Sequence, residues 1–128
     1  MIIKMIEQST GSAYHDDLFI AERWIDGIVV LSVRDTVDML SAPRLTEAIR
    51  AALTKAPIAL IVDLTDVNFL ASVGMSVLVE AQQQADAISA RFGVVAEGAA
   101  TSRPMRLLGI NAVLALYPSL DEALREFR

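Results

Sequence analysis

Apolar and polar positions follow one another along the chain in two patterns, one typical of β-strands and one typical of α-helices. The segment LFIAERWIDGIVVLSV (18–33) has two apolar runs around Asp26-Gly27. Asp-Gly between such runs favours a hairpin, because glycine accepts the positive φ of the turn. The segment IALIVDL (58–64) is apolar on both faces until Asp63, which is typical of a central strand covered on both sides. Two shorter strands are predicted in FGVVAEG (92–98) and AVLALY (112–117).

Helical spacing occurs between these strands. In SAPRLTEAIRAALTK (41–55), apolar residues recur at i, i+3, i+4, i+7 and i+8 and predict one buried stripe. Ser41 is placed to cap this helix, and Pro43 lies in its first turn, where no amide partner is needed. A second helix is expected from about Ser72 to Ala90, because the run EAQQQADA combines strong helix formers with a polar side.

Two more helices are predicted near the end of the chain. SRPMRLLGI (102–110) is typical of a short helix capped by Ser102, and in SLDEALREF (119–127) Ser119 and Glu122 have the spacing of a capping box. The element order is therefore β-β-α-β-α-β-α-β-α. This order predicts an α/β fold, in which an opening hairpin leads into a mixed, mostly parallel sheet packed by about four helices.

The chain is expected to form one domain preceded by an arm. Its 128 residues suit a single domain, and a chain of this length can bury an apolar core without disulfides. The segment EQSTGSAYHDD (7–17) is polar and aperiodic. Residues 1–17 are therefore predicted to be a weakly structured N-terminal arm, and residues 18–128 the folded domain.

Composition excludes several classes of protein. The chain has no cysteine, which rules out disulfides and thiolate chemistry and fits a reducing compartment. No apolar run approaches the roughly 18 residues of a membrane span, and no secretion signal is recognised, so we expect a cytoplasmic protein. The net charge is -5 and the basic residues are scattered. Nucleic-acid binding is therefore not expected, and a protein partner is favoured.

The sequence also lacks the residues that most enzymes need. Its only histidine, His15, lies in the predicted arm, where it could serve Ser72 only if the arm folded over that residue. There is no glycine-rich phosphate loop, no histidine pair and no dinucleotide fingerprint. We expect no enzymatic activity, no cofactor and no metal site.

One short segment, Ala71-Ser72-Val73-Gly74, lies where the central strand passes into the second helix. Ser72 has two interpretations: it caps the helix, or it carries a phosphate that the amides and partial positive charge of the helix N-terminus would tolerate. Gly74 permits a tight strand-to-helix turn, and it could also leave the first helical turn bare for a partner's backbone, since the two roles are compatible. Met39 and Leu40 are either exposed contacts of the same surface or covered by the first helix, and Trp24 is expected to pack within or at the edge of the hairpin.

Three motifs and the last element resemble a known family in their order and spacing. DTVD (35–38) stands where members usually carry Gly-Glu-Leu-Asp, DLT (63–65) stands for Asp-Leu-Ser, and ASVG (71–74) stands for Asp-Ser-Ser/Thr-Gly. LALYPSLDEAL (114–124) is similar to the usual last strand and helix. Over roughly residues 19–127 the chain resembles the STAS domain, specifically the bacterial anti-sigma factor antagonists.

The resemblance implies a regulatory function. In that family the anti-sigma factor is a serine kinase with a histidine-kinase-like ATP-binding fold, and it phosphorylates the first serine of the junction. The unphosphorylated antagonist binds this kinase and releases the sigma factor, and a PP2C-type phosphatase reverses the modification. By position, the phosphoacceptor is Ser72, and the partner-binding residues are Asp38, Ser72, Gly74 and Met75.

The sequence departs from the family pattern at three positions. Ala71 replaces the aspartate before the serine, Val73 replaces the second hydroxyl residue, and Asp35 replaces the glycine after the hairpin. These departures weaken the expectation of phosphorylation more than that of binding. An alternative is therefore a constitutive interaction scaffold that holds a partner, or a second copy of itself as a homodimer, with Ser72 acting only as a helix cap.

Overall fold

The computed structural model describes residues 17–128, so all of the predicted N-terminal arm except Asp17 lies outside the described residues. The elements, in chain order, are β1 (Phe19–Ile25), β2 (Ile28–Val37), α1 (Ala42–Thr54), β3 (Ala59–Leu70), α2 (Ser72–Ala87), β4 (Arg91–Val95), α3 (Ser102–Leu107), the 3-10 helix η1 (Ile110–Ala112), β5 (Leu116–Tyr117) and α4 (Leu120–Phe127). This order confirms the predicted alternation of strands and helices.

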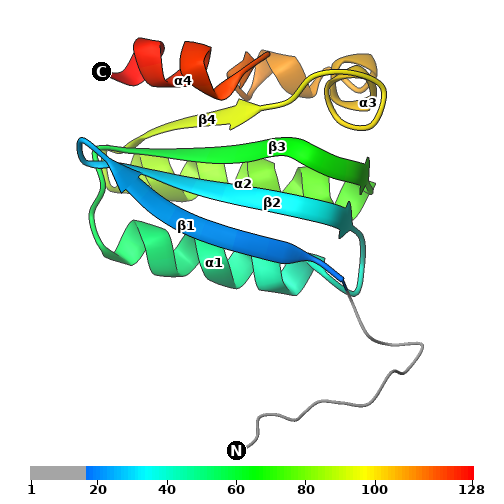
Figure 1. The fold of residues 1–128 in the computed structure, drawn as a ribbon, viewed down its shortest axis with the longest axis horizontal. Helices are drawn as coiled ribbons and strands as arrows, with labels where there is room; N and C mark the ends of the chain where they lie inside the picture. The colour runs from blue at the N-terminus through cyan, green and yellow to red at the C-terminus, as the bar shows by residue number, and fades with distance from the viewer. Residues whose placement is uncertain (1–16) are drawn as a thin grey trace, which may run out of the picture.

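The five strands form one mixed sheet in the order β1-β2-β3-β4-β5 (Figure 1). β1 and β2 are antiparallel, whereas every other neighbouring pair is parallel. The hairpin turns at Asp26 and Gly27, whose φ angles of 52° and 82° are those of a turn that suits the right-handed twist of two strands. The predicted opening hairpin and parallel sheet are therefore confirmed.

Helices cover both faces of the sheet, but not to the same extent. Alternate residues of β2 point to opposite sides: Val29, Leu31 and Val33 join the larger core with α1 and α2, whereas Ile28 and Val30 join a smaller core with α4. Figure 1 shows α1 and α2 on one side of the sheet and α4 on the other. β2 and β3 are therefore central strands with apolar residues on both faces, which the sequence pattern predicts for β3.

The central strand is longer than its sequence pattern indicates. β3 continues to Leu70, six residues beyond the predicted end at Leu64. The extension stays in the sheet because it pairs with the second half of β2, through two irregularities of register near Arg34 and Asp35. β4 pairs with β3 only as far as Asp63. The extension therefore projects past β4 and delivers the β3–α2 junction to one edge of the sheet.

The end of the chain is less regular than predicted. The fifth strand consists of only Leu116 and Tyr117, and part of the expected strand is the 3-10 helix η1. Gly109, with a φ of 77°, ends the helical segment before η1. The short alternating run AVLALY was therefore too weak a signal to define the strand bounds.

The serines predicted to cap helices differ in what their hydroxyls do. Ser119 caps α4 as predicted, since its Oγ accepts a hydrogen bond from the Glu122 amide at 3.2 Å. Ser41 occupies the N-cap position of α1 but makes no capping bond. The prediction for Ser102 is wrong: it lies inside α3, and its Oγ accepts a hydrogen bond from the Gly98 amide at 2.9 Å. Spacing alone does not show which neighbouring amide a hydroxyl will reach.

Candidate functional site

Three connections meet at the edge of the sheet where the parallel strands end. They are the β2–α1 loop (38–41), the β3–α2 junction (71–72) and the β4–α3 loop (96–101). In Figure 1 the arrowheads of β2, β3 and β4 point to the same end of the sheet, where α3 also lies. Ligands and partners of open α/β sheets bind beyond the carboxyl ends of the strands, so a functional site is expected at this edge.

Ser72 is the first residue of α2, and its side chain is exposed. The residue at the N-cap is Ala71, in an extended conformation with φ -76° and ψ 164° and without a side chain that could cap. Within residues 17–128, the Ser72 hydroxyl makes no hydrogen bond. The prediction that Ser72 caps the helix is therefore wrong, and its oxygen is accessible to another molecule.

The backbone around Ser72 is held firmly although its side chain is not. The Ala71 amide donates to the Val37 carbonyl oxygen at 2.8 Å, which ties the junction to the end of β2. The Ala71 carbonyl oxygen accepts from the Gly74 and Met75 amides at 2.9 and 3.2 Å. The amides of Ser72 and Val73 have no acceptor among the described residues. The junction therefore presents a rigid helix N-terminus with two available donors, a setting that favours a negative charge.

Gly74 faces the interior of the domain. A Cβ atom placed on it would lie 2.6 Å from Cγ1 of Val37 and 2.7 Å from Cδ1 of Leu70, both closer than carbon atoms can approach. Glycine is therefore needed for α2 to pack on the ends of β2 and β3. This geometry supports the tight strand-to-helix connection, and the partner-binding role of Gly74 stays a prediction.

A groove of about 460 Å³ lies between α2 and the segment that contains α3 and η1. Met75 is only 5% exposed, yet it contributes to the floor of this groove beside the exposed hydroxyls of Ser72 and Ser76. The complete lining of this α2–α3 groove is Ser72, Met75, Ser76, Val79, Glu80, Gln83, Leu108 and Ile110. Met75 can therefore contact only a group that enters the groove.

A second groove, of about 420 Å³, lies on the other side of the first turn of α2. This α1–α2 groove is lined by Met39, Ala42, Pro43, Thr46, Glu47, Arg50, Val73 and Val77. Met39 is 79% exposed, and Leu40 and Val73 are also exposed. Of the two interpretations of Met39 and Leu40, the structure shows the exposed one. Ser72 thus lies between two partly apolar grooves, and we call this region the Ser72 surface.

Asp38 holds the loop that carries Met39 and Leu40. Its Oδ1 accepts hydrogen bonds from the Leu40 amide at 3.0 Å and the Ser41 amide at 3.1 Å. The Ser41 hydroxyl accepts from the Asp38 amide at 3.0 Å and donates to the Thr36 carbonyl oxygen at 2.8 Å. Asp38 is half-buried and its carboxylate is already engaged, so its first role is to position the exposed side chains that follow it.

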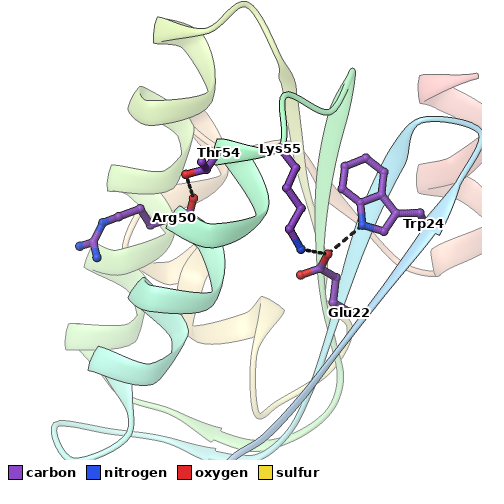
Figure 2. Close-up of polar contacts among 5 residues, drawn as sticks. All are labelled: Glu22, Trp24, Arg50, Thr54 and Lys55. Carbon is purple, nitrogen blue, oxygen red and sulfur yellow. Dashed lines mark hydrogen bonds and ion pairs between the residues drawn. The ribbon is translucent and has the colours of Figure 1, made fainter.

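Perturbed ionisable groups lie away from the Ser72 surface. A hydrogen bond from the Lys55 ammonium to Glu22 Oε2, at 2.8 Å, lowers the pKa of the Glu22 carboxyl, and a second bond from the Trp24 indole N–H acts in the same direction (Figure 2). Burial raises the pKa of Tyr117, and the nearby charge of Glu126 adds to this. Trp24 is partly exposed on β1 and does not join the Ser72 surface.

Between residues 17 and 128, no three histidine or acidic side chains are placed to hold a metal ion. No helix in the described part of the chain has the length and apolar character needed to cross a membrane. Asp38 lies in the β2–α1 loop, and Ser72, Gly74 and Met75 lie in the first turn of α2 at the same edge of the sheet.

Sequence reasoning missed the contribution of α3. Leu107 and Leu108 are 79% and 64% exposed, and Leu108 lines the α2–α3 groove together with Ser72. The available signal was the pair of adjacent leucines at the end of a helix of six residues, Leu107 being its last residue and Leu108 its C-cap, since two adjacent side chains point in different directions.

Comparison with known proteins is consistent with this geometry. The STAS domain family matches residues 20–123. The anti-sigma-F factor antagonist RsfB of Mycobacterium tuberculosis is 38% identical over 103 residues, which cover 80% of this chain and 84% of RsfB. The crystal structure of an anti-sigma factor antagonist from Mycobacterium paratuberculosis is also 38% identical and superposes with a TM-score of 0.83, covering 91% of this chain and 97% of that one.

A more distant structure shares the fold. The anti-sigma factor antagonist SpoIIAA, in its unphosphorylated form, has a TM-score of 0.71 at 14% identity and covers 84% of this chain and 95% of its own. The family match extends over most of the sequence, the mycobacterial relative is well aligned, and the sheet order is the one expected. This chain belongs to the STAS domain family.

Proposed function

We propose that this protein is an anti-sigma factor antagonist, a cytoplasmic binding protein that docks an anti-sigma factor on the Ser72 surface and so releases a sigma factor. One observation carries the proposal. An exposed serine hydroxyl, with no hydrogen-bond partner among residues 17–128, stands on a rigid helix N-terminus between two partly apolar grooves. The relatives at 38% identity are named for this function, and they align over most of the chain.

The composition of the surface supports protein binding. Met39, Leu40 and Val73 are exposed together around the first turn of α2, where a soluble domain would otherwise place polar side chains. Methionine adapts to many partners because its side chain is unbranched and flexible. The loop that presents Met39 is held by Asp38, so little entropy is lost when a partner orders it.

We further propose that phosphorylation of Ser72 switches the interaction off. A phosphoserine adds about 1.5 to 2 negative charges at neutral pH, and the amides of Ser72 and Val73, which have no acceptor among the described residues, give it local hydrogen-bond donors. The charge would stand between the two grooves, where a partner must lose water to bind. Release would then require no refolding. The kinase would be the anti-sigma factor itself, and a PP2C-type phosphatase would restore binding.

A binding assay tests the docking function. Each anti-sigma factor encoded by the source organism is purified and titrated with this protein, and the factor that binds wild type is taken as the cognate partner. Ser72→Glu should weaken that binding by at least about tenfold, because a charge is placed in the interface. Gln84→Glu is the control: it adds the same charge to α2 about 18 Å further along the helix. Failure of every anti-sigma factor to bind would overturn the proposal.

A second experiment tests the switch. Incubation with the cognate anti-sigma factor and ATP should add one phosphoryl group, about 80 Da, to the peptide that contains Ser72. Ser72→Ala should abolish the gain in mass, whereas Ser76→Ala, which removes the other serine of the α2–α3 groove, should not. A phosphate that remains in Ser72→Ala, or that never forms on wild type, would contradict the switch but not the docking.

The constitutive scaffold is a second candidate, and one observation favours it. Ala71 and Val73 leave the junction without the side-chain oxygens that members of the family usually place on either side of the serine. In a scaffold, partner affinity would be the same for Ser72→Ala and Ser72→Glu. Equal affinities of these two variants, with binding intact, would select the scaffold over the switched antagonist.

A further inference from the structure

The helix α3 carries two arginines that have no ionic partner among the described residues. Lys55, Arg50, Arg91 and Arg128 each lie within 4.0 Å of a carboxylate. Arg103 and Arg106 are exposed and form no ion pair in the described part of the chain; the same holds for Arg23 and Arg125, which lie on separate elements. They lie three residues apart on one helix and therefore share a side of it.

The same short helix exposes apolar surface. Leu107 and Leu108 follow the arginines directly, and both are more than 60% exposed. Adjacent exposed leucines are unusual on a free surface, because exposing apolar side chains to water is unfavourable. Arginine, in addition, is enriched where proteins bind one another. We call Arg103, Arg106, Leu107 and Leu108 the α3 patch.

The α3 patch is continuous with the Ser72 surface. Leu108 lines the α2–α3 groove together with Ser72, and the preceding residue, Leu107, lines a second hollow of about 460 Å³ together with Arg103 and Arg106. α3 also follows the carboxyl end of β4, so the sheet brings it to the same edge as the β2–α1 loop and the β3–α2 junction (Figure 1). One partner seated over Ser72 would therefore reach α3.

Charge indicates what kind of surface fits the α3 patch. Glu97 is the only acidic residue that lines the hollow, and it forms no ion pair with Arg103 or Arg106. The chain as a whole carries a net charge of -5, so two adjacent unpaired cations are a local exception. A complementary partner would present carboxylates to the arginines and apolar side chains to the leucines.

We propose that the α3 patch is a second contact region that binds an acidic, partly apolar surface of the same anti-sigma factor and selects it among related ones. This inference rests on the proposed function, since it concerns the same partner. According to this inference, Ser72 governs whether the complex forms, whereas Arg103 and Arg106 govern which anti-sigma factor is recognised. Exposed charges at the rim of an interface act mainly on the association rate and on its dependence on salt.

Binding kinetics with the cognate anti-sigma factor test the inference. Arg103→Glu/Arg106→Glu should lower affinity at about 0.1 M salt by at least roughly tenfold, mainly through slower association, and the defect should shrink at about 0.5 M salt. The matched control is Arg23→Glu/Arg125→Glu, which makes the same change in net charge at two exposed arginines of β1 and α4. The control should change affinity less than about twofold, since its charges lie far from the contact.

The leucines are tested in the same assay. Leu107→Ala/Leu108→Ala should speed dissociation by roughly tenfold, because a buried apolar contact acts mostly on the lifetime of a complex. Ile88→Ala removes a similar exposed side chain at the far end of α2 and should have no effect. Circular dichroism and thermal melting establish that each variant is folded before it is titrated.

Ser72→Glu in the same series separates this inference from the proposed function. If Ser72→Glu binds weakly while Arg103→Glu/Arg106→Glu binds as wild type, the α3 patch is not a contact region and the docking function stands. If neither change weakens binding, both proposals are overturned.

An equal loss in the Arg23→Glu/Arg125→Glu control would show a general charge effect and would also reject the patch. Self-association that disappears with the α3 arginines, without a change in anti-sigma binding, would instead assign the patch to a second copy of the chain.

Discussion

Gly74 in the first turn of α2 lies directly against Val37 at the end of β2. A Cβ atom at Gly74 would be 2.6 Å from Cγ1 of Val37, well inside the distance at which carbon atoms repel. The Ala71 amide, three residues earlier, donates to the carbonyl oxygen of the same Val37. The start of α2 is thus fixed to β2 by a hydrogen bond and by the absence of a side chain.

This contact predicts that Gly74→Ala lowers the free energy of unfolding. Overpacking costs typically about 1 to 3 kcal/mol, and the better helix propensity of alanine offsets up to about 1 kcal/mol of that loss. We expect a net loss of about 1 to 2 kcal/mol, measured by urea denaturation. Ser76→Ala, at an exposed position of the same helix, should change stability by less than about 0.5 kcal/mol. A Gly74→Ala protein as stable as wild type would show that the packing is not as described.

The N-cap of α2 predicts a stabilising change. Ala71 has the extended conformation of an N-cap residue but no side-chain acceptor, and the Val73 amide has no acceptor within the described part of the chain. Ala71→Asp supplies a carboxylate to that amide and to the positive helix end, and should raise the free energy of unfolding by about 1 kcal/mol.

Thermal or urea denaturation at neutral pH measures this gain. Ala87→Asp, which places the same charge at the last residue of α2, is the control and should be destabilising by about 0.3 to 1 kcal/mol. Equal effects at the two ends would mean that net charge, and not the helix terminus, determines the change.

Asp35 is a third position with a defined expectation. Its φ of 79° lies in the left-handed region, and its carboxylate makes no hydrogen bond with a described residue. A glycine adopts this conformation without a steric penalty, so Asp35→Gly should stabilise the protein by about 0.5 to 1 kcal/mol after the extra freedom of the unfolded chain is counted.

The control for Asp35 lies on the same strand. Ser32 has an ordinary strand conformation, since it is not among the described residues with positive φ. Ser32→Gly should therefore cost about 0.5 to 1 kcal/mol. Opposite signs for the two glycine substitutions in one denaturation series would identify backbone strain at Asp35, and a loss in both would exclude it.

Glu22 predicts a pH dependence whose sign follows from its lowered pKa. The ionised carboxylate is favoured in the native state by Lys55 first and by the Trp24 indole second. Its stabilising contribution is fully present above the ordinary glutamate pKa of about 4.3 and is lost as the pH falls through the lower native value. The difference in urea midpoint between wild type and Glu22→Gln should therefore be largest near neutral pH and should disappear under acidic conditions.

Trp24 reports on the same titration. It is the only tryptophan of the chain, and its indole N–H donates to Glu22 Oε2 at 2.8 Å (Figure 2). Its fluorescence should change as Glu22 is protonated, and Lys55→Met should shift the midpoint of that change to higher pH. Because the pair is exposed, salt should weaken the effect. An unchanged midpoint in Lys55→Met would contradict the assignment of Lys55 as the main cause.

The sequence by itself determined the order of the elements and the place of the candidate site. Apolar runs of period two and stripes of helical period differ enough to separate strands from helices, and Asp26-Gly27 is a local turn signal that needs no tertiary context. The junction at Ser72 was identified for the same reason, since a buried strand, small residues and a helix follow one another directly in the chain.

Contacts between distant segments decided what the sequence left open. The second half of β3 alternates poorly and is a strand only because β2 pairs with it, and Ser72 failed as a cap because Ala71 occupies that position in the folded junction. The inward orientation of Gly74 depends on Val37, and the groove beside Ser72 depends on Leu108, which follows Ser72 by 36 residues in the chain. Such features arise from packing and hydrogen bonding across the sheet, which no local pattern of residues encodes.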